Sequence, residues 1–257
     1  MRSLPDDNLS YPVLLETPNG SGSGFYFRTD KKIFLVTALH VLYQKENNTW
    51  SLNSDDLKLT SYDKFPNISE AIEFQVDLSK ASIRKDDDKD IALIEMANIS
   101  MDNSNIQWLD GIKKLTQKTA NIVVVQPNTL KVFRDVLVSN DVFILGFPSS
   151  LGTSKQIEEK RPLLRKGVVA GINTKNKTII LDCPVYFGNS GGMAIEVEED
   201  LPNVKYRVIG VVSQYIPFVE QLKSLELGYI NLNFENSGYS VVVPIDTIIE
   251  LTQEKPE

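Results

Sequence analysis

The chemistry of this chain can be traced from one side chain, because His40 is its only histidine. It ends residues 34–40 (FLVTALH), in which three apolar residues lead into a turn of small residues. An imidazole can accept and return a proton near neutral pH, which makes it the usual general base of enzymes. A lone histidine is more often an ordinary surface or core residue. His40 therefore indicates catalysis only if a nucleophile and a carboxylate accompany it.

A candidate nucleophile is Ser190, within residues 187–192 (FGNSGG). The glycines on both sides leave its hydroxyl unshielded and allow unusual backbone angles, so the N–H groups of Gly188 and Ser190 could converge on one point, as an oxyanion site requires. The segment also fits the nucleophile elbow of α/β-hydrolases, in which the histidine follows the serine. Because His40 precedes Ser190, that fold is excluded.

The third partner must be a carboxylate, and Asp90 is the strongest candidate among the 34 acidic residues. It separates the charged residues 86–89 from the apolar residues 91–94. A carboxylate at the edge of an apolar strand can be partly buried, where it holds the Nδ1–H of an imidazole. We interpret residues 86–88 as a solvated charge run.

The elements that would position these residues are short β-branched segments separated by Asn, Asp, Gly and Pro. They predict strands and an all-β barrel or sandwich. Two segments favour helices: residues 244–251, with Asp246 as a cap, and, more weakly, residues 106–115. Residues 47–69 read as a polar insertion, and residues 174–178 as a hairpin loop. The predicted strands cover residues 13–15, 25–28, 33–37, 90–96, 122–125, 142–147, 167–172, 178–181, 192–197, 206–213 and 239–243.

Residues 20–24 (GSGSG) resemble a phosphate-binding loop, but that loop requires a helix directly after it. The next residues, 25–27, are strand formers instead. A strand that lies close to another backbone is therefore the better interpretation.

Composition excludes several functions. A net charge of −7 argues against nucleic acid as the main partner. No apolar run is long enough to span a membrane, and no signal peptide is visible. The single cysteine, Cys183, excludes an intrachain disulfide and is expected to be a buried core residue. With one histidine and one cysteine, only carboxylates could bind a metal, and none of them shows a ligand-spaced motif. We therefore expect a cytoplasmic protein without metal or other cofactor.

With His40, Asp90 and Ser190 in this order, the chain resembles the chymotrypsin-like serine proteases, in particular HtrA-type and other prokaryotic trypsin-like peptidases. The resemblance implies two six-stranded antiparallel β-barrels with a short C-terminal helix. Residues 1–120 would form the barrel with His40 and Asp90, and residues 121–257 the barrel with Ser190. The matching segments are residues 22–25 (GSGF), 36–40 (VTALH), 90–93 (DIAL), 142–148 (VFILGFP), 188–192 (GNSGG) and 210–213 (GVVS).

The resemblance further implies a serine endopeptidase that acts on a protein or peptide through an acyl-enzyme. Gly188, Asn189 and Ser190 would form the oxyanion hole, and the hydroxyl of Ser213 would lie near Asp90. Because Pro184 stands where trypsin-type enzymes carry an aspartate, the primary pocket should be uncharged. Asn189 replaces the aspartate that captures a cleaved N-terminus in digestive members, so no such zymogen switch is expected. The substrate-binding residues would be Pro184, Val185, Phe187, Ser213, Gln214 and Tyr215.

Two alternatives remain open at this point. The same double barrel could be a silent pseudoprotease that binds proteins, and an unrelated strand-rich interaction domain is the more remote possibility. Residues 214–237 form a long insertion in which Phe218, Leu222 and Leu225 have helical spacing. It is either a packed elaboration of the barrel or a gate beside the substrate strand. We also expect that control lies in a regulatory partner or in neighbouring subunits.

Overall fold

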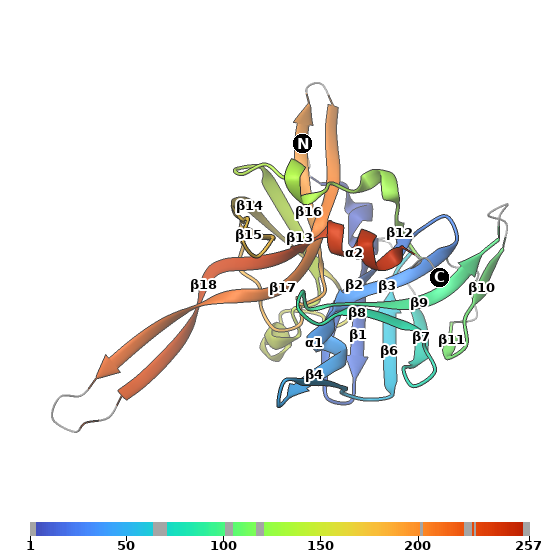
Figure 1. The fold of residues 1–257 in the computed structure, drawn as a ribbon, viewed down its shortest axis with the longest axis horizontal. Coiled ribbons are helices and arrows are strands. Elements are labelled where there is room, and N and C mark those ends of the chain that lie inside the picture. The colour runs from blue at the N-terminus through green and yellow to red at the C-terminus, as the bar shows by residue number, and fades with distance from the viewer. Residues whose placement is uncertain are drawn as a thin grey trace.

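The computed structural model describes residues 4–63, 71–100, 105–116, 121–200, 203–223, 228 and 230–253. The described residues form two large, mainly antiparallel sheets, one from each half of the chain, and a small two-stranded sheet (Figure 1). None of the described helices is long and apolar enough to cross a membrane.

The first sheet has ten strands in the main order β10-β9-β3-β2-β1-β6-β7-β11, with β8 beside β9 and β12 beside β2. Over the described residues this path does not return to its first strand. The sheet is therefore open, whereas a closed six-stranded barrel was expected. Its strands are β1 (Pro12–Thr17), β2 (Gly20–Arg28), β3 (Lys32–Ala38), β6 (Asp56–Ser61), β7 (Ile72–Asp77), β8 (Ile83–Asp86), β9 (Ile91–Ile99), β10 (Ile106–Trp108), β11 (Ile112–Lys114) and β12 (Val124–Val125). The small sheet pairs β4 (Tyr43–Glu46) with β5 (Thr49–Leu52).

The second sheet closes into a six-stranded barrel in the order β13-β14-β15-β18-β17-β16. The turn after residue 173 joins β14 to β15, as predicted. Two strands are unusually long, and Figure 1 shows them leaving the barrel together as an arm. The six strands are β13 (Asp141–Gly146), β14 (Leu163–Asn173), β15 (Thr178–Asp182), β16 (Met193–Asp200), β17 (Asn203–Lys223) and β18 (Ile230–Pro244).

Helices are few and short. The predicted helix near the end of the chain is confirmed as α2 (Ile245–Thr252). Asp246 does not cap it, because its carboxylate accepts the N–H of Phe133 at 2.8 Å. The remaining helical segments are α1 (Leu39–Leu42) and the 3-10 turns η1 (Asp6–Ser10), η2 (Pro127–Thr129), η3 (Phe133–Asp135) and η4 (Ser149–Ser154).

Two further sequence predictions were wrong. Residues 106–115 form β10 and β11 rather than a helix, because Gly111 takes φ +79° and turns the chain between them. Residues 47–69 were read as a polar insertion, but β6 lies within them and buries Leu57 and Leu59 on alternate positions. Residues 64–70 of that segment lie outside the described residues.

The Gly-rich residues 20–24 lie in β2, so the strand interpretation is confirmed. A side chain at Gly24 would place its Cβ 2.6 Å from the carbonyl oxygen of Val36 on β3. Only glycine allows the two backbones to approach this closely. The glycine therefore allows β2 to lie directly against β3, the strand that leads to His40.

One apolar cluster joins the two halves and carries α2. It combines Phe25 and Phe34 of the first sheet, Phe143 of the barrel, and Ile245 and Ile248 of α2. All are nearly fully buried. The apolar face of α2 thus packs across the joint between the two halves.

A buried charge cluster also attaches α2 to the first sheet. Arg84 of β8 donates to the Glu95 carboxylate of β9 at 2.7 Å and to the carbonyl of Leu251 at 3.0 Å. Lys32 donates to the same carboxylate at 2.8 Å. Burial alone raises the pKa of the Glu95 carboxyl, but the bonds from Lys32 and Arg84 outweigh it, and the net pKa lies below the ordinary value.

Replacing Arg84 with methionine should lower the free energy of unfolding by about 2 kcal/mol, because it leaves a buried carboxylate and a helix end with fewer partners. Since the pKa of Glu95 is depressed, its stabilising effect is present above the ordinary value of 4.5 and is lost as the pH falls. The difference between variant and parent should therefore shrink below that pH. Urea unfolding at several pH values measures it. Arg134→Met is the matched control, because that side chain is 85% exposed; an equal loss in both variants would contradict the prediction.

Candidate active site

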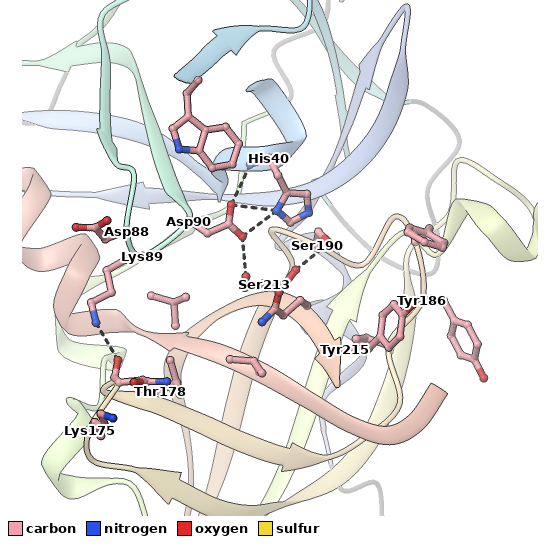
Figure 2. Close-up of a pocket in the computed structure, with 17 residues that line it drawn as sticks. His40, Asp88, Lys89, Asp90, Lys175, Thr178, Tyr186, Ser190, Ser213 and Tyr215 are labelled. Carbon is pink, nitrogen blue, oxygen red and sulfur yellow. Dashed lines mark hydrogen bonds and ion pairs between the residues drawn. The ribbon is translucent and has the colours of Figure 1, made fainter. Parts of the chain in front are cut away.

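A cleft of about 790 Å³ contains all three residues singled out by the sequence. The first half contributes His40 and Asp90, and the second half contributes Ser190 (Figure 2). A strand of the barrel, β17, supplies Ser213, Gln214 and Tyr215 to the same lining.

His40 reaches the cleft because β3 ends at Ala38 and the chain turns into the short helix α1. Its ring Nδ1 lies 2.8 Å from Oδ2 and 3.0 Å from Oδ1 of Asp90. An ionised carboxylate can only accept, so Nδ1 must carry the hydrogen, and Nε2 of the neutral ring is left as the basic nitrogen.

Asp90 is held in place by its own backbone and by three donors. It takes φ +59°, an uncommon angle for a residue other than glycine, and its carbonyl accepts the N–H of Leu39 at 3.0 Å. Its carboxylate accepts the backbone N–H of His40 at 3.0 Å and the hydroxyl of Ser213 at 2.6 Å, besides the ring. The carboxylate therefore has little freedom to turn away from the imidazole.

Ser190 faces the same cleft with its hydroxyl pointed elsewhere. Its Oγ donates to the carbonyl of Ser213 at 3.0 Å. Among the described residues no hydrogen bond joins it to His40. The nucleophile loop nevertheless lies against the histidine segment, because a Cβ at Gly191 would come within 2.3 Å of Thr37 Oγ1 and 3.0 Å of the Ala38 nitrogen.

Ser23 of β2 connects the nucleophile loop to the first sheet. Its hydroxyl donates to the carbonyl of Gly188 at 2.6 Å and accepts the N–H of Phe147 at 2.8 Å. Its backbone N–H donates to the carbonyl of Ser190 at 2.8 Å. Ser23 is fully buried, so these bonds fix the Gly188–Asn189 and Ser190–Gly191 peptides of the loop. Residues 22–25 were expected to match a motif of the family, but this role of Ser23 was not predicted.

The three loop residues proposed for an oxyanion site behave differently. Within the described part of the chain, the N–H groups of Gly188 and Ser190 have no hydrogen-bond acceptor, so both can serve a bound oxygen. The N–H of Asn189 donates to the carbonyl of Tyr186 at 2.9 Å, and its side-chain oxygen accepts the N–H of Tyr186 at 3.0 Å. Asn189 thus shapes the loop and does not offer its own N–H.

Five of the six predicted substrate-binding residues line the cleft, and Pro184 does not. Tyr186 was missed, although its place between Val185 and Phe187 could have suggested it. The Arg165 guanidinium lies over the Tyr186 ring, 4.6 Å from its centroid. The rings of Phe187 and Tyr215 pack edge to face, with their centroids 6.3 Å apart. Figure 2 shows Tyr186 and Tyr215 well separated from Asp88, Lys89 and Lys175. One end of the cleft is therefore aromatic and the other is charged.

Cys183 packs in the barrel core and is fully buried. Burial raises the pKa of its thiol to about 11, so it stays protonated at neutral pH. The described residues also contain no group of three His, Cys, Asp or Glu side chains that could hold a metal ion.

A strand-built fold in two halves, with an imidazole on a carboxylate and a glycine-flanked serine in the cleft between them, defines the class of trypsin-like serine proteases. Residues 22–201 match the family model of the trypsin-like peptidase domain. The chain therefore belongs to the trypsin-like peptidase family and is a serine protease.

Solved structures agree with this fold. The alignment with the crystal structure of Deg5 has a TM-score of 0.52 and 20% sequence identity, and it covers 95% of this chain and 88% of the Deg5 chain. The alignment with the HtrA-type protease AlgW, solved with a tripeptide, has a TM-score of 0.51 and 15% sequence identity, and it covers 94% of this chain and 58% of the AlgW chain. At these identities the similarity shows the fold alone. No curated protein matches the chain.

Proposed function

We propose that the protein is a serine endopeptidase that cleaves protein or peptide substrates with His40, Asp90 and Ser190 as its catalytic residues. The observation that carries the proposal is the contact between His40 Nδ1 and Asp90 Oδ2, at 2.8 Å, in the cleft that Ser190 also lines. It leaves Nε2 of the only histidine free to act as a base.

In the proposed reaction the Ser190 hydroxyl rotates from the Ser213 carbonyl toward His40. Nε2 accepts its proton while Oγ attacks the substrate carbonyl, and the imidazolium then returns the proton to the leaving amine. A water molecule then attacks the acyl-enzyme while His40 again accepts and returns a proton, and the acyl group is released from Ser190. Asp90 offsets the charge of the imidazolium, and Ser213 keeps Asp90 in line. Catalytic hydrogen bonds often form only once substrate is bound, so the present bond of Ser190 is compatible with this role.

The negative charge of the tetrahedral intermediate would be stabilised by the N–H groups of Gly188 and Ser190. Donors that are already in place cost no reorganisation in the transition state, and each is worth about 3 kcal/mol. Support comes from the carbonyls of the same two peptides. The Phe187 carbonyl accepts the N–H of Ser150 at 3.3 Å, and the Asn189 carbonyl accepts the N–H of Gly192 at 2.9 Å, so both peptides are held in place.

We further propose that the enzyme is competent without cleavage of its own chain. Asn189 is 2% exposed and satisfied within its loop by Tyr186. The loop therefore needs no new N-terminus to hold it. The primary pocket would favour an apolar side chain, because Val185, Phe187 and Tyr215 line that end of the cleft.

A fluorophosphonate probe followed by intact-mass and peptide-mass analysis tests the proposed function. We expect the uncleaved protein to gain one adduct on Ser190, and Ser190→Ala and His40→Ala to gain none. Absence of labelling in the folded parent protein would refute the proposal.

One observation favours a second candidate, a silent double barrel that binds proteins: the hydroxyl of Ser190 is bonded to Ser213 and not to His40. If this arrangement persists with substrate bound, the serine is not activated. The same probe separates the two, since the silent form would stay unlabelled.

A further inference from the structure

The arm consists of residues 217–223 of β17 and residues 230–236 of β18. It extends far beyond the barrel in Figure 1. Phe218, Leu222 and Leu225 have helical spacing in the sequence, but Phe218 and Leu222 lie on a strand, and Leu225 lies outside the described residues. Positions four apart share a face in a strand as well as in a helix, so the spacing could not distinguish them.

The two faces of the arm differ in character. Opposite residues of an antiparallel pair lie on the same face, and successive residues alternate. The pairs Val219–Phe234, Gln221–Leu232 and Lys223–Ile230 therefore form one face, which we call the apolar face. The other face carries Glu220, Glu235, Asn231 and Asn233 beside Phe218 and Leu222.

The apolar face lacks a covering partner in the described part of the chain. Val219 is 48% exposed, Ile230 54%, Leu232 50% and Phe234 61%. A two-stranded ribbon is only marginally stable in water, and apolar side chains gathered on one exposed face mark an interaction site.

The arm also has an open strand edge that continues the wall of the cleft. β16 pairs with β17 only as far as Val211. Beyond that point, over the described residues, β17 pairs only with β18. Ser213 to Tyr215 line the cleft, and the same strand runs on to Lys223, with a register shift between Tyr215 and Pro217.

The base of the arm is attached to the loop before Ser190. Asn236 donates to the carbonyl of Val185 at 2.7 Å, and Ser237 donates to the carbonyl of Ile216 at 2.5 Å. Val185 lines the cleft. A chain bound along the arm would therefore be held in register with the cleft.

From these observations we infer that the arm is a docking site for the substrate itself, an inference that rests on the proposed function. An extended segment on the amino-terminal side of the scissile bond adds as a third strand to the open edge of β17. Its alternate side chains extend the apolar face. The arm positions correspond to roughly the fourth to tenth residues before the scissile bond, since paired strands advance together. The preferred substrate class is a protein with alternating apolar residues in that segment.

A second copy of the chain is the less favourable occupant. Four half-exposed side chains offer about 100 Å² each, so two arms packed face to face would bury about 800 Å² in total. Stable interfaces need at least about 1,200 Å². Substrate bound in the cleft adds the missing area, because cleft and arm share one strand.

The test compares peptidyl phosphonates, which react with the serine and occupy only the amino-terminal side of the bond. The short probe carries four residues before the phosphonate. The long probe adds eight residues in front of these four, in which valine and threonine alternate. The shifted probe has the same eight residues with the alternation moved by one position. We expect the long probe to modify Ser190 about tenfold faster than the short one. The shifted probe should lose this advantage, because a one-residue slip moves every valine to the other face.

Leu232→Glu should bring the long and short probes to equal rates. Leu222→Glu, with similar exposure on the opposite face, should keep the tenfold ratio. Equal rates for both probes on the parent protein, or equal effects of both variants, would overturn the inference. So would a dimer in sedimentation that Leu232→Glu dissociates while probe length has no effect. A simple fluorophosphonate is run alongside, and failure of its labelling would instead refute the proposed function.

Discussion

Asp90→Asn is expected to lower kcat about 10⁴-fold, the size of effect that follows when the orienting carboxylate of such a site becomes an amide. The hydroxyl of Ser213 and the backbone N–H of His40 both donate to this side chain. The N–H of His40 bonds to Oδ1 and the Ser213 hydroxyl to Oδ2. Since a backbone N–H can only donate, the amide oxygen of asparagine will take the Oδ1 position. Its NH₂ will take the Oδ2 position, where it faces Nδ1 and the Ser213 hydroxyl, which can turn to accept. The ring must then carry its hydrogen on Nε2, where it cannot act as a base.

The tautomer can be observed directly. His40 is the only histidine, so the imidazole signals in a ¹H–¹⁵N spectrum need no further assignment. We expect Nδ1–H in the parent protein and Nε2–H in Asp90→Asn. Asp87→Asn is the control, because it removes the same charge from a 53% exposed side chain that pairs with Lys85. If Asp90→Asn keeps more than about a tenth of the activity, Asp90 does not have the role proposed for it.

The second large effect is expected for Gly188→Ala, which should slow phosphonylation of Ser190 and substrate turnover by about 10²- to 10³-fold. Gly188 has φ +97°, and an added Cβ would lie 2.2 Å from the carbonyl oxygen of Phe147 and 2.5 Å from the Ser149 nitrogen. The peptide must rotate to relieve these contacts. Its N–H would then leave the position from which it can stabilise an oxyanion.

Gly171→Ala provides the matched control in the same barrel, because a Cβ there meets nothing within 4 Å. Gly188→Ala should unfold at the lower temperature of the two, because its Cβ meets backbone atoms. Thermal scans followed by circular dichroism would establish that both variants are folded at the temperature of the assay. A Gly188→Ala protein that is folded and reacts as fast as Gly171→Ala would show that the Gly188 N–H does not contribute.

Some strands were predicted from a local pattern, as for β3, a continuous apolar run that ends in a turn. β7 was not predicted, although its residues alternate between buried and half-buried positions with the period of two of a strand. Short edge strands such as β10 and β11 were missed, because three residues carry too little pattern to separate strand from helix.

The arm was located as an insertion, but its form was not predicted. Phe218 and Leu222 satisfy both periods, and only the pairing of β17 with β18 decides between them. The open first sheet has the same origin, since closure depends on which edge strands meet and not on the pattern within each strand.

The sequence by itself determined which groups are available for catalysis: one imidazole, a serine among glycines, and their order along the chain. The tertiary structure decided which of 34 acidic residues holds the imidazole, where the Ser190 hydroxyl points, and that Ser213 locks a carboxylate 123 residues away. The physical reason is that residue type and local periodicity are properties of the sequence itself. Hydrogen bonds between distant segments exist only after both sheets have folded and packed.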